Sequence, residues 1–224
     1  MSEEKLRIFD DAVPIVRDVV DRHGGRKIVD LCSGGGGPLL SILEKIDADA
    51  VLTDLYPNVQ AFKQSEQRFP ERVRGWRAPV DATNVPDELE GVRTLFNAFH
   101  HFRPALAKKI LEDAARKKRP LVILEVVERH PLTMAVIACV PLAVLALTPF
   151  TKPPLLRLLL TYVLPLLPLA TGWDGLASCA RAYSIAELQA LADSVVVDGY
   201  AFRVGHTARG LVPMRVTYLV GEPA

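Results

Sequence analysis

Four consecutive glycines, Gly34 to Gly37, follow an apolar run that ends in an acid in the stretch "IVDLCSGGGGPLL". Glycine lacks a Cβ atom, so it allows sharp turns and lets another molecule approach the bare main chain. The run 27–31 has the length of a buried strand, and Pro38 suits the first turn of a helix. The sequence therefore predicts a strand, a glycine loop that can admit a ligand, and a helix.

Strands and helices alternate from this point to Val127, which is typical of a parallel sheet with helices on both faces. Further strands are predicted over 49–55, 75–82, 94–99 and 120–127. Helices are predicted over 6–20, 38–46, 59–68 and 104–116, and from Ser184. The last two strands, 199–205 and 214–221, have no helix between them and predict an antiparallel hairpin at one edge. The expected fold is α/β, with a Rossmann-like sheet of seven mostly parallel strands.

Composition limits the possible functions. The chain has 224 residues, 50% of them hydrophobic, which suffices for one domain over 1–224. A net charge of +1 and scattered basic residues argue against nucleic-acid binding. The three cysteines lie far apart, so neither a metal site nor a disulfide framework is expected. The charged start "MSEEKLRIFDDAV" is no signal peptide, and a cytoplasmic location is expected.

Three kinds of glycine loop compete for this stretch. A P-loop ends in Gly-Lys-Ser/Thr, whereas Pro38 and Leu39 follow the glycines here. A dinucleotide fingerprint could use Gly34 and Gly36, but Leu39 stands where a third small residue is needed. The third kind admits the ribose and amino-acid parts of S-adenosylmethionine.

Acidic residues downstream favour the third kind. Asp54 follows Asp30 by 24 residues and can accept hydrogen bonds from both ribose hydroxyls. Asp81, predicted to end the third strand, can accept a hydrogen bond from an adenine amino group. Asp30 itself can orient the loop or attract the methionine ammonium. Ligands of open parallel sheets bind at the carboxyl ends of the strands, where all these residues are expected.

The stretches "VDLCSGGGG", "LTDLYP", "PVDAT", "LFNAFHHF" and "ILEVVE" resemble, in their order, the class I S-adenosylmethionine-dependent methyltransferases. The resemblance covers roughly Arg26 to Glu128, and "RAYSIAEL" is similar to the late helix of that family. Cys32 and Ser33 depart from it, because the family usually has glycine and a small residue there. The resemblance implies a donor site formed by Asp30, Cys32, Gly34, Gly36, Asp54, Leu55, Asp81, Ala82 and Asn97.

Methyl transfer is an in-line displacement in which the enzyme mainly aligns the two reactants. His100 and His101 follow the fourth strand, and either could serve as a base or merely cap and pack. Candidate residues for the substrate are Glu125, Glu128, Tyr162, Trp173 and Tyr183.

Two uncharged runs, 131–151 and 158–173, interrupt the pattern after the fifth strand. The first could cross a bilayer by length. A single crossing would put strands of one sheet on opposite sides of the membrane, and four prolines are expected to break the helices. We therefore expect 130–173 to form an apolar cap of short helices over the strand ends. Its expected inner side holds Met134, Ile137, Leu145, Phe150, Leu159 and Tyr162.

Three uses of this cap remain open. It can line a pocket for an apolar substrate, contact a membrane as a peripheral protein, with Lys152 and Arg157 on anionic headgroups, or bury itself against the core or another subunit. The sequence thus predicts methyl transfer to an apolar small molecule or lipid-like acceptor, such as an isoprenoid or quinone. The alternatives are a non-catalytic S-adenosylmethionine-binding protein that docks through the cap, and a NAD-dependent oxidoreductase.

Overall fold

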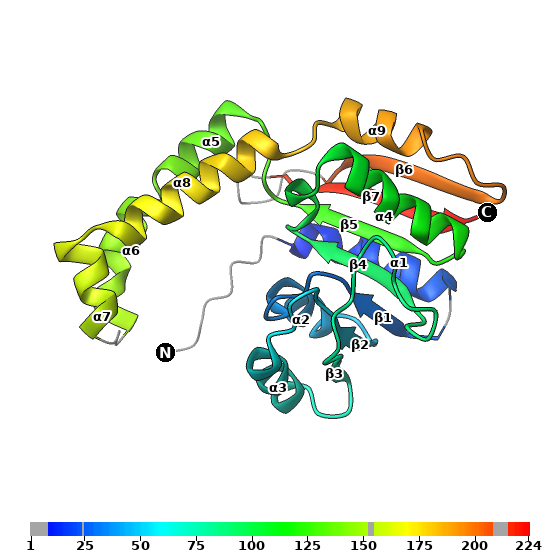
Figure 1. Cartoon of the computed structure of the whole chain (residues 1–224), viewed down its shortest axis with the longest axis horizontal. Helices are drawn as coiled ribbons and strands as arrows, with labels where there is room; N and C mark the ends of the chain where they lie inside the picture. Colours follow the sequence, from blue (N-terminus) through cyan, green and yellow to red (C-terminus); the bar gives the residue numbers. More distant parts are fainter. Residues whose placement is uncertain (1–8, 24, 152–154, 208–214) are drawn as a thin grey trace. The chain divides into compact units, whose positions relative to one another are not determined.

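The computed structural model describes residues 9–23, 25–151, 155–207 and 215–224. The chain divides into two compact units, one formed by residues 1–126 and 185–224 and the other by residues 127–184. We call them the sheet unit and the hairpin unit and describe each by itself (Figure 1).

Within the described residues, seven strands form one sheet in the order β3-β2-β1-β4-β5-β7-β6. The strands are β1 (Lys27–Asp30), β2 (Asp49–Leu52), β3 (Val73–Gly75), β4 (Val92–Phe96), β5 (Leu121–Glu125), β6 (Tyr200–His206) and β7 (Thr217–Pro223). The first five run parallel, and β7 is antiparallel to both β5 and β6. This confirms the predicted fold class, including the terminal hairpin at one edge.

Helices cover both faces of this sheet (Figure 1). They are α1 (Val13–His23), α2 (Gly37–Leu43), α3 (Val59–Arg68), α4 (Pro104–Arg116) and α9 (Ile185–Asp193), with short 3₁₀ turns η1 (Asp10–Ala12) and η2 (Phe99–His101). Helices α3 and α4 have the predicted bounds. Strands β4 and β5 are buried along their whole length, as the apolar runs predict for strands covered on both faces.

The third strand was predicted too late in the chain. It spans Val73–Gly75 and not 75–82, so Asp81 lies in a loop beyond it. Pairing with β2 ends at Gly75, opposite Leu52. Residues 76–80 are not part of the strand and bend at Ala78, and Pro79 has no N–H to donate to a ladder, although the stretch resembles a strand in sequence.

The first helix also begins later than predicted. Helix α1 starts at Val13, with Pro14 in its first turn, where the missing N–H of proline costs nothing. The predicted residues 6–8 lie outside the described part of the chain.

The hairpin unit consists of helices from both uncharged runs. Helices α5 (Pro131–Ala138) and α6 (Val140–Leu147) form one arm with η3 (Thr148–Thr151). Helix α7 (Leu155–Leu158), a π-helical turn η4 (Leu159–Val163) and α8 (Leu166–Arg181) form the return. Helix α8 packs along α5 and α6. Lys152, assigned above to headgroups, lies outside the described residues.

Prolines interrupt the hairpin unit less than predicted. Pro141 lies in the first turn of α6, so α5 and α6 continue as one apolar helical stretch, Pro131–Phe150. Pro165 precedes α8, and there the helices bend by 73°. By length and composition alone, Pro131–Phe150 could cross a membrane, and the bent pair could form a second crossing.

Candidate functional site

The glycine loop begins where β1 ends. Cys32, Gly34 and Gly36 have φ values of 56°, 54° and 76°, in the left-handed region. The Ser33 N–H donates to the Thr53 carbonyl at 2.9 Å, which anchors the loop to the end of β2. A Cβ on Gly36 would lie 3.1 Å from Leu52, so this glycine is needed both for its conformation and for space.

The Asp54 carboxylate lies against this loop. Its Oδ2 accepts a hydrogen bond from the Gly34 N–H at 3.0 Å, and its Oδ1 accepts one from the Tyr56 N–H at 3.0 Å. Leu55 and Tyr56, directly after it, expose apolar side chains. A carboxylate beside bare backbone and an apolar surface can bind the hydroxyl groups of a sugar while a flat base packs alongside.

Asp30 is buried at the end of β1. Its Oδ1 accepts a hydrogen bond from Thr94 Oγ1 of β4 at 2.7 Å. Burial raises the pKa of Asp30 to about 7, because the charged form loses its hydration. Burial also raises the pKa of the Cys32 thiol to about 12, and the neighbouring Asp54, Asp30 and Asp81 carboxylates add to that shift. A cationic ligand group here would favour the charged form of Asp30 and would be attracted by the Asp54 and Asp81 carboxylates.

Asp81 uses part of its hydrogen-bonding capacity locally. Its Oδ1 accepts hydrogen bonds from the N–H and Oγ1 of Thr83, both at 2.8 Å. Ala82, next to it, is buried. Asp81 therefore stabilises its turn through Oδ1. Among the described residues, Oδ2 remains available to accept a hydrogen bond from a ligand.

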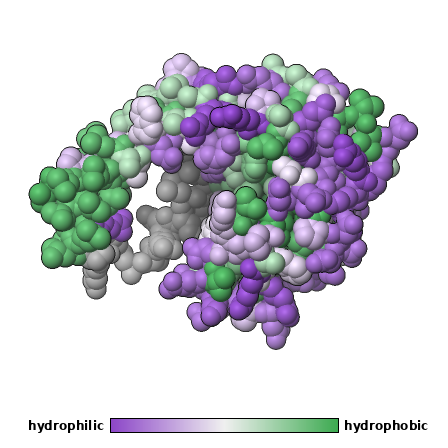
Figure 2. Space-filling model, in the orientation of Figure 1, coloured by the Kyte–Doolittle hydropathy of each residue, from purple (hydrophilic) through white to green (hydrophobic). Residues whose placement is uncertain are grey.

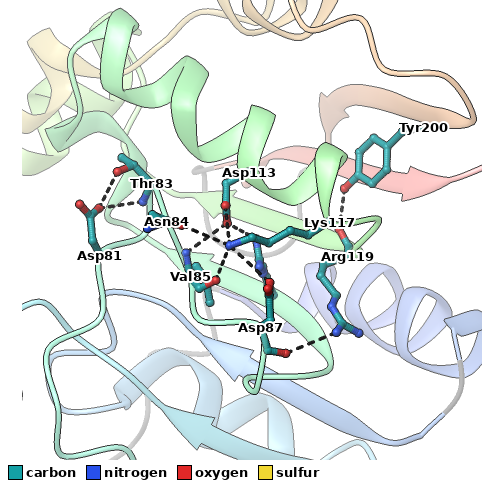
Figure 3. A network of polar contacts seen from close by, with 10 residues as sticks. Asp81, Thr83, Asn84, Val85, Asp87, Asp113, Lys117, Arg119 and Tyr200 are labelled. Carbon is teal, nitrogen blue, oxygen red and sulfur yellow. Dashed lines mark hydrogen bonds and ion pairs between the residues drawn. The ribbon is translucent and has the colours of Figure 1, made fainter.

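A polar network ties the loop after Asp81 to α4 (Figure 3). Asp113 pairs with the buried Arg93 at 2.7 Å and accepts from the Val85 N–H at 3.2 Å. Lys117 donates to the Val85 carbonyl at 2.5 Å and pairs with Asp113 at 2.8 Å. The loop that carries Asp81 is thus held on the sheet unit by buried and half-buried charges.

A second polar cluster lies where β4 and β5 end. His100 Nδ1 lies 2.5 Å from Glu125 Oε2, and the Phe99 N–H donates to Glu125 Oε1 at 2.6 Å. Both His100 and Glu125 are buried. Among the described residues, His100 Nε2 is one of three buried side-chain N or O atoms without a hydrogen-bond partner. With Nδ1–H donating to the carboxylate, Nε2 carries a lone pair that can accept a proton.

The neighbours of this pair have different roles. His101 is exposed and stacks on His100, with ring centroids 4.1 Å apart. Asn97 has a φ of 49°, and its side-chain oxygen accepts from the Val126 N–H at 2.8 Å. Asn97 therefore joins the ends of β4 and β5, which orients both elements of the cluster.

The structure gathers most of the predicted site residues at the carboxyl ends of β1, β2, β4 and β5. The predicted substrate residues Glu128, Tyr162, Trp173 and Tyr183 belong instead to the hairpin unit. There Glu128 accepts from Thr133 Oγ1 at 2.7 Å, and Tyr162 and Trp173 are exposed. Their role toward a substrate stays a prediction.

Sequence reasoning missed two contributions. Thr94 and Thr53 hold Asp30 and the loop, and Arg93–Asp113 fixes the Asp81 loop. A charged residue inside the apolar run of β4 was the available signal for the buried pair, since Arg93 needs a carboxylate there.

The described residues hold a further cavity and no metal site. No group of three or more His, Cys, Asp or Glu there could hold a metal ion. A cavity of about 420 Å³ lies at the amino ends of β1 and β4, lined by Lys27, Glu90, Gly91 and Arg119 among others. Within it Arg119 pairs with Glu90 at 3.0 Å.

No protein-family model matches the sequence, and no curated protein matches it. Solved structures do share the fold. The pyocyanin biosynthetic protein PhzM superposes with a TM-score of 0.58 and 16% identity, over 97% of this chain and 55% of that one.

Two further structures were solved with cofactor or product. NcsB1, an O-methyltransferase from neocarzinostatin biosynthesis in complex with S-adenosylmethionine and 2-hydroxy-5-methyl naphthoic acid, gives a TM-score of 0.51 at 17% identity, over 86% of this chain and 48% of that one. Magnesium protoporphyrin IX methyltransferase from Synechocystis PCC 6803 with bound SAH gives a TM-score of 0.51 at 13% identity, over 97% of this chain and 85% of that one. The chain spans about half the length of PhzM and NcsB1. It has the Rossmann-like fold of S-adenosylmethionine-dependent methyltransferases.

Proposed function

We propose that this chain is an S-adenosylmethionine-dependent methyltransferase acting on an apolar small-molecule or lipid-like acceptor, in the cytoplasm or at a membrane facing it. The observation that carries the proposal is the contact of Asp54 with the Gly34 N–H beside the buried Asp30, at the carboxyl ends of parallel strands. Asp54 would accept the ribose hydroxyls and Asp30 would attract the methionine ammonium.

His100 is the proposed base, and Glu125 is its positioning residue. The donor is already activated as a sulfonium, so the chain has only to align the acceptor and take its proton. The hydrogen bond from His100 Nδ1 to Glu125 leaves Nε2 as the atom that takes this proton and stabilises the imidazolium formed. The apolar acceptor is proposed from the hydrophobic side chains of the hairpin unit.

Calorimetry with S-adenosylhomocysteine tests the donor site. Asp54→Ala should weaken binding by about 1.5–3 kcal/mol, the scale of a hydrogen bond to a charged group. Asp47→Ala, an exposed acid paired with Arg26, is the matched control and should bind like wild type. Wild-type protein that does not bind S-adenosylhomocysteine but is stabilised against thermal unfolding by NADH would favour the oxidoreductase.

Turnover with an apolar acceptor tests the base. His100→Ala should lower kcat by about 10²–10⁴-fold while donor affinity stays the same. His101→Ala, on the exposed neighbour, should have a much smaller effect. Donor binding without turnover of any acceptor would favour the non-catalytic binding protein.

A further inference from the structure

The hairpin unit has its small residues inside and its large apolar residues outside. Its buried described residues are Thr133, Thr148, Thr161, Pro168, Gly172, Ser178, Cys179 and Ala182. Among the residues that the structure describes, 15 of the 20 exposed large hydrophobic side chains belong to this unit. Figure 2 shows them gathered over α6 and α7. A helical hairpin that folds in water has the opposite arrangement.

Glycines hold the two arms together. A Cβ on Gly172 would lie 2.7 Å from Pro141, and one on Gly175 would lie 2.5 Å from Ile137. The backbone of α8 therefore approaches α5 and α6 more closely than larger residues would allow. Such packing through small residues is typical of helices in lipid, where leucines gain nothing by burying themselves against each other.

The hydroxyl groups of the arms are satisfied within the helices. Thr148 Oγ1 donates to the Val144 carbonyl at 2.6 Å, and Thr161 and Thr171 donate to carbonyls four residues earlier at 2.7 and 2.9 Å. The Tyr162 hydroxyl donates to the Leu145 carbonyl of the opposite arm. In hydrocarbon no water replaces a missing partner, so this arrangement suits the inside of a bilayer.

Most charged residues of this unit lie near the ends of its arms. Pro131–Phe150 has 20 residues and no charge, a length of about 30 Å and close to the hydrocarbon thickness. Glu128, Arg129 and Arg181 lie at the open end of this unit, and Arg157 lies in α7 at the turn. Asp174 lies partway along α8, at the level of Ile137 and Pro141, which Gly175 and Gly172 approach. Trp173 beside it is 77% exposed.

The exposed side chains surround the arm and do not form one face. Leu132 and Met134 of α5 are both exposed, although they point about 160° apart around the helix axis. A second copy of the chain would cover one side and leave the other wet, whereas acyl chains cover all sides.

We propose that the helices within residues 131–151 and 155–173 insert as a hairpin into the hydrocarbon core of a lipid bilayer. Both ends of the hairpin continue into the sheet unit, at β5 and at α9, so the chain enters and leaves on the same side. The inference deepens the membrane contact of the proposed function but does not depend on methyl transfer.

Flotation of the full chain with vesicles tests the proposal. Wild type should float with phosphatidylcholine vesicles, with or without added phosphatidylglycerol, and should resist alkaline carbonate. The triple variant Leu142→Glu, Leu155→Glu, Leu166→Glu alters residues that are 57–81% exposed in water, and so should keep its fold. The charge at position 142, near the middle of Pro131–Phe150, should lower partitioning by about 100-fold, and the two charges nearer the turn should lower it further. Val196→Glu, at an equally exposed position of the sheet unit, should float like wild type.

Fluorescence locates the hairpin independently. The chain has two tryptophans, Trp76 and Trp173. Lipids brominated along their acyl chains should quench wild-type emission, and Trp173→Phe, which leaves Trp76 alone, should abolish that quenching.

Three results would overturn insertion. They are wild type that stays in the soluble fraction, a triple variant that floats like wild type, and flotation that needs phosphatidylglycerol and is reversed by carbonate. A dimer that the triple variant converts to monomer, without flotation, would assign the surface to a second copy. Calorimetry of the triple variant with S-adenosylhomocysteine separates the two proposals, because its donor site is unchanged.

Discussion

The two units of the chain bury opposite kinds of side chain. In the sheet unit the fully buried residues include Phe62, Phe99 and Leu111, and the buried Arg93 and His100 each pair with a carboxylate. In the hairpin unit the buried residues are small, several carry hydroxyls, and leucines face outward. The sheet unit therefore has the burial pattern of a protein folded in water, and the hairpin unit has the pattern of helices packed in lipid.

The largest test of this comparison removes a buried charge from the sheet unit. Asp113→Ala should lower the free energy of unfolding by about 3–5 kcal/mol, because Arg93 is left buried without its carboxylate. Urea unfolding measures the change. Glu112→Ala, its neighbour in a half-exposed pair with Arg116, should change stability by less than about 1 kcal/mol. A similar loss of stability in both variants would mean that water or another polar group solvates Arg93 once its carboxylate is gone.

A pair of leucines compares the two units directly. Leu111→Ala, fully buried in α4, should lower the free energy of unfolding by about 2–5 kcal/mol. Leu155→Ala, 81% exposed in α7, should change it in water by no more than about 0.5 kcal/mol. Equal losses would show that the hairpin unit buries Leu155 in solution and would break the comparison.

Most of the sheet unit could be predicted, because its strands are apolar runs separated by helical periods. Helices α3 and α4 match the expected bounds, and β7 lies antiparallel as expected. The contact between His100 and Glu125 could not be predicted, because it joins residues 25 positions apart through the pairing of β4 with β5. Strand β3 was misplaced because its three residues carry a weaker strand pattern than the residues after it.

The hairpin unit was harder to predict for a physical reason. A run of leucines and valines predicts burial, but it does not say whether protein, ligand or lipid does the burying. The proline rule also misled, since Pro141 is harmless in the first turn of α6.

The pH dependence of stability tests the one buried acid of the site whose pKa is raised. Folded Asp30 keeps its proton up to about pH 7, whereas the unfolded chain loses it near 3.8. Stability should therefore fall as pH rises between these values, by about 2–4 kcal/mol in total. Asp30→Asn should flatten this slope in urea titrations, and Asp47→Asn on an exposed loop should not. An unchanged slope in Asp30→Asn would assign the pH dependence to other groups.

The smallest expected change in stability concerns Cys32, which stands where the methyltransferases that the sequence resembles usually have glycine. Cys32 has a φ of 56°, which costs a side chain about 1 kcal/mol. Cys32→Gly should regain part of this cost in thermal unfolding, while Cys32→Ala, which keeps a Cβ, should not. A loss of stability in Cys32→Gly would show that packing of the thiol outweighs the strain.

The order of the strands has a consequence for the chain during its synthesis. One edge of β5 has no hydrogen-bonding partner until β7 pairs with it. This pairing runs from Leu121 opposite Gly221 to Glu125 opposite Thr217. The hairpin unit, α9 and β6 all leave the ribosome between these two strands. For that interval an open sheet edge and a leucine-rich hairpin are exposed together, and both promote aggregation. During translation, therefore, the chain depends on chaperones or a membrane to cover these two surfaces.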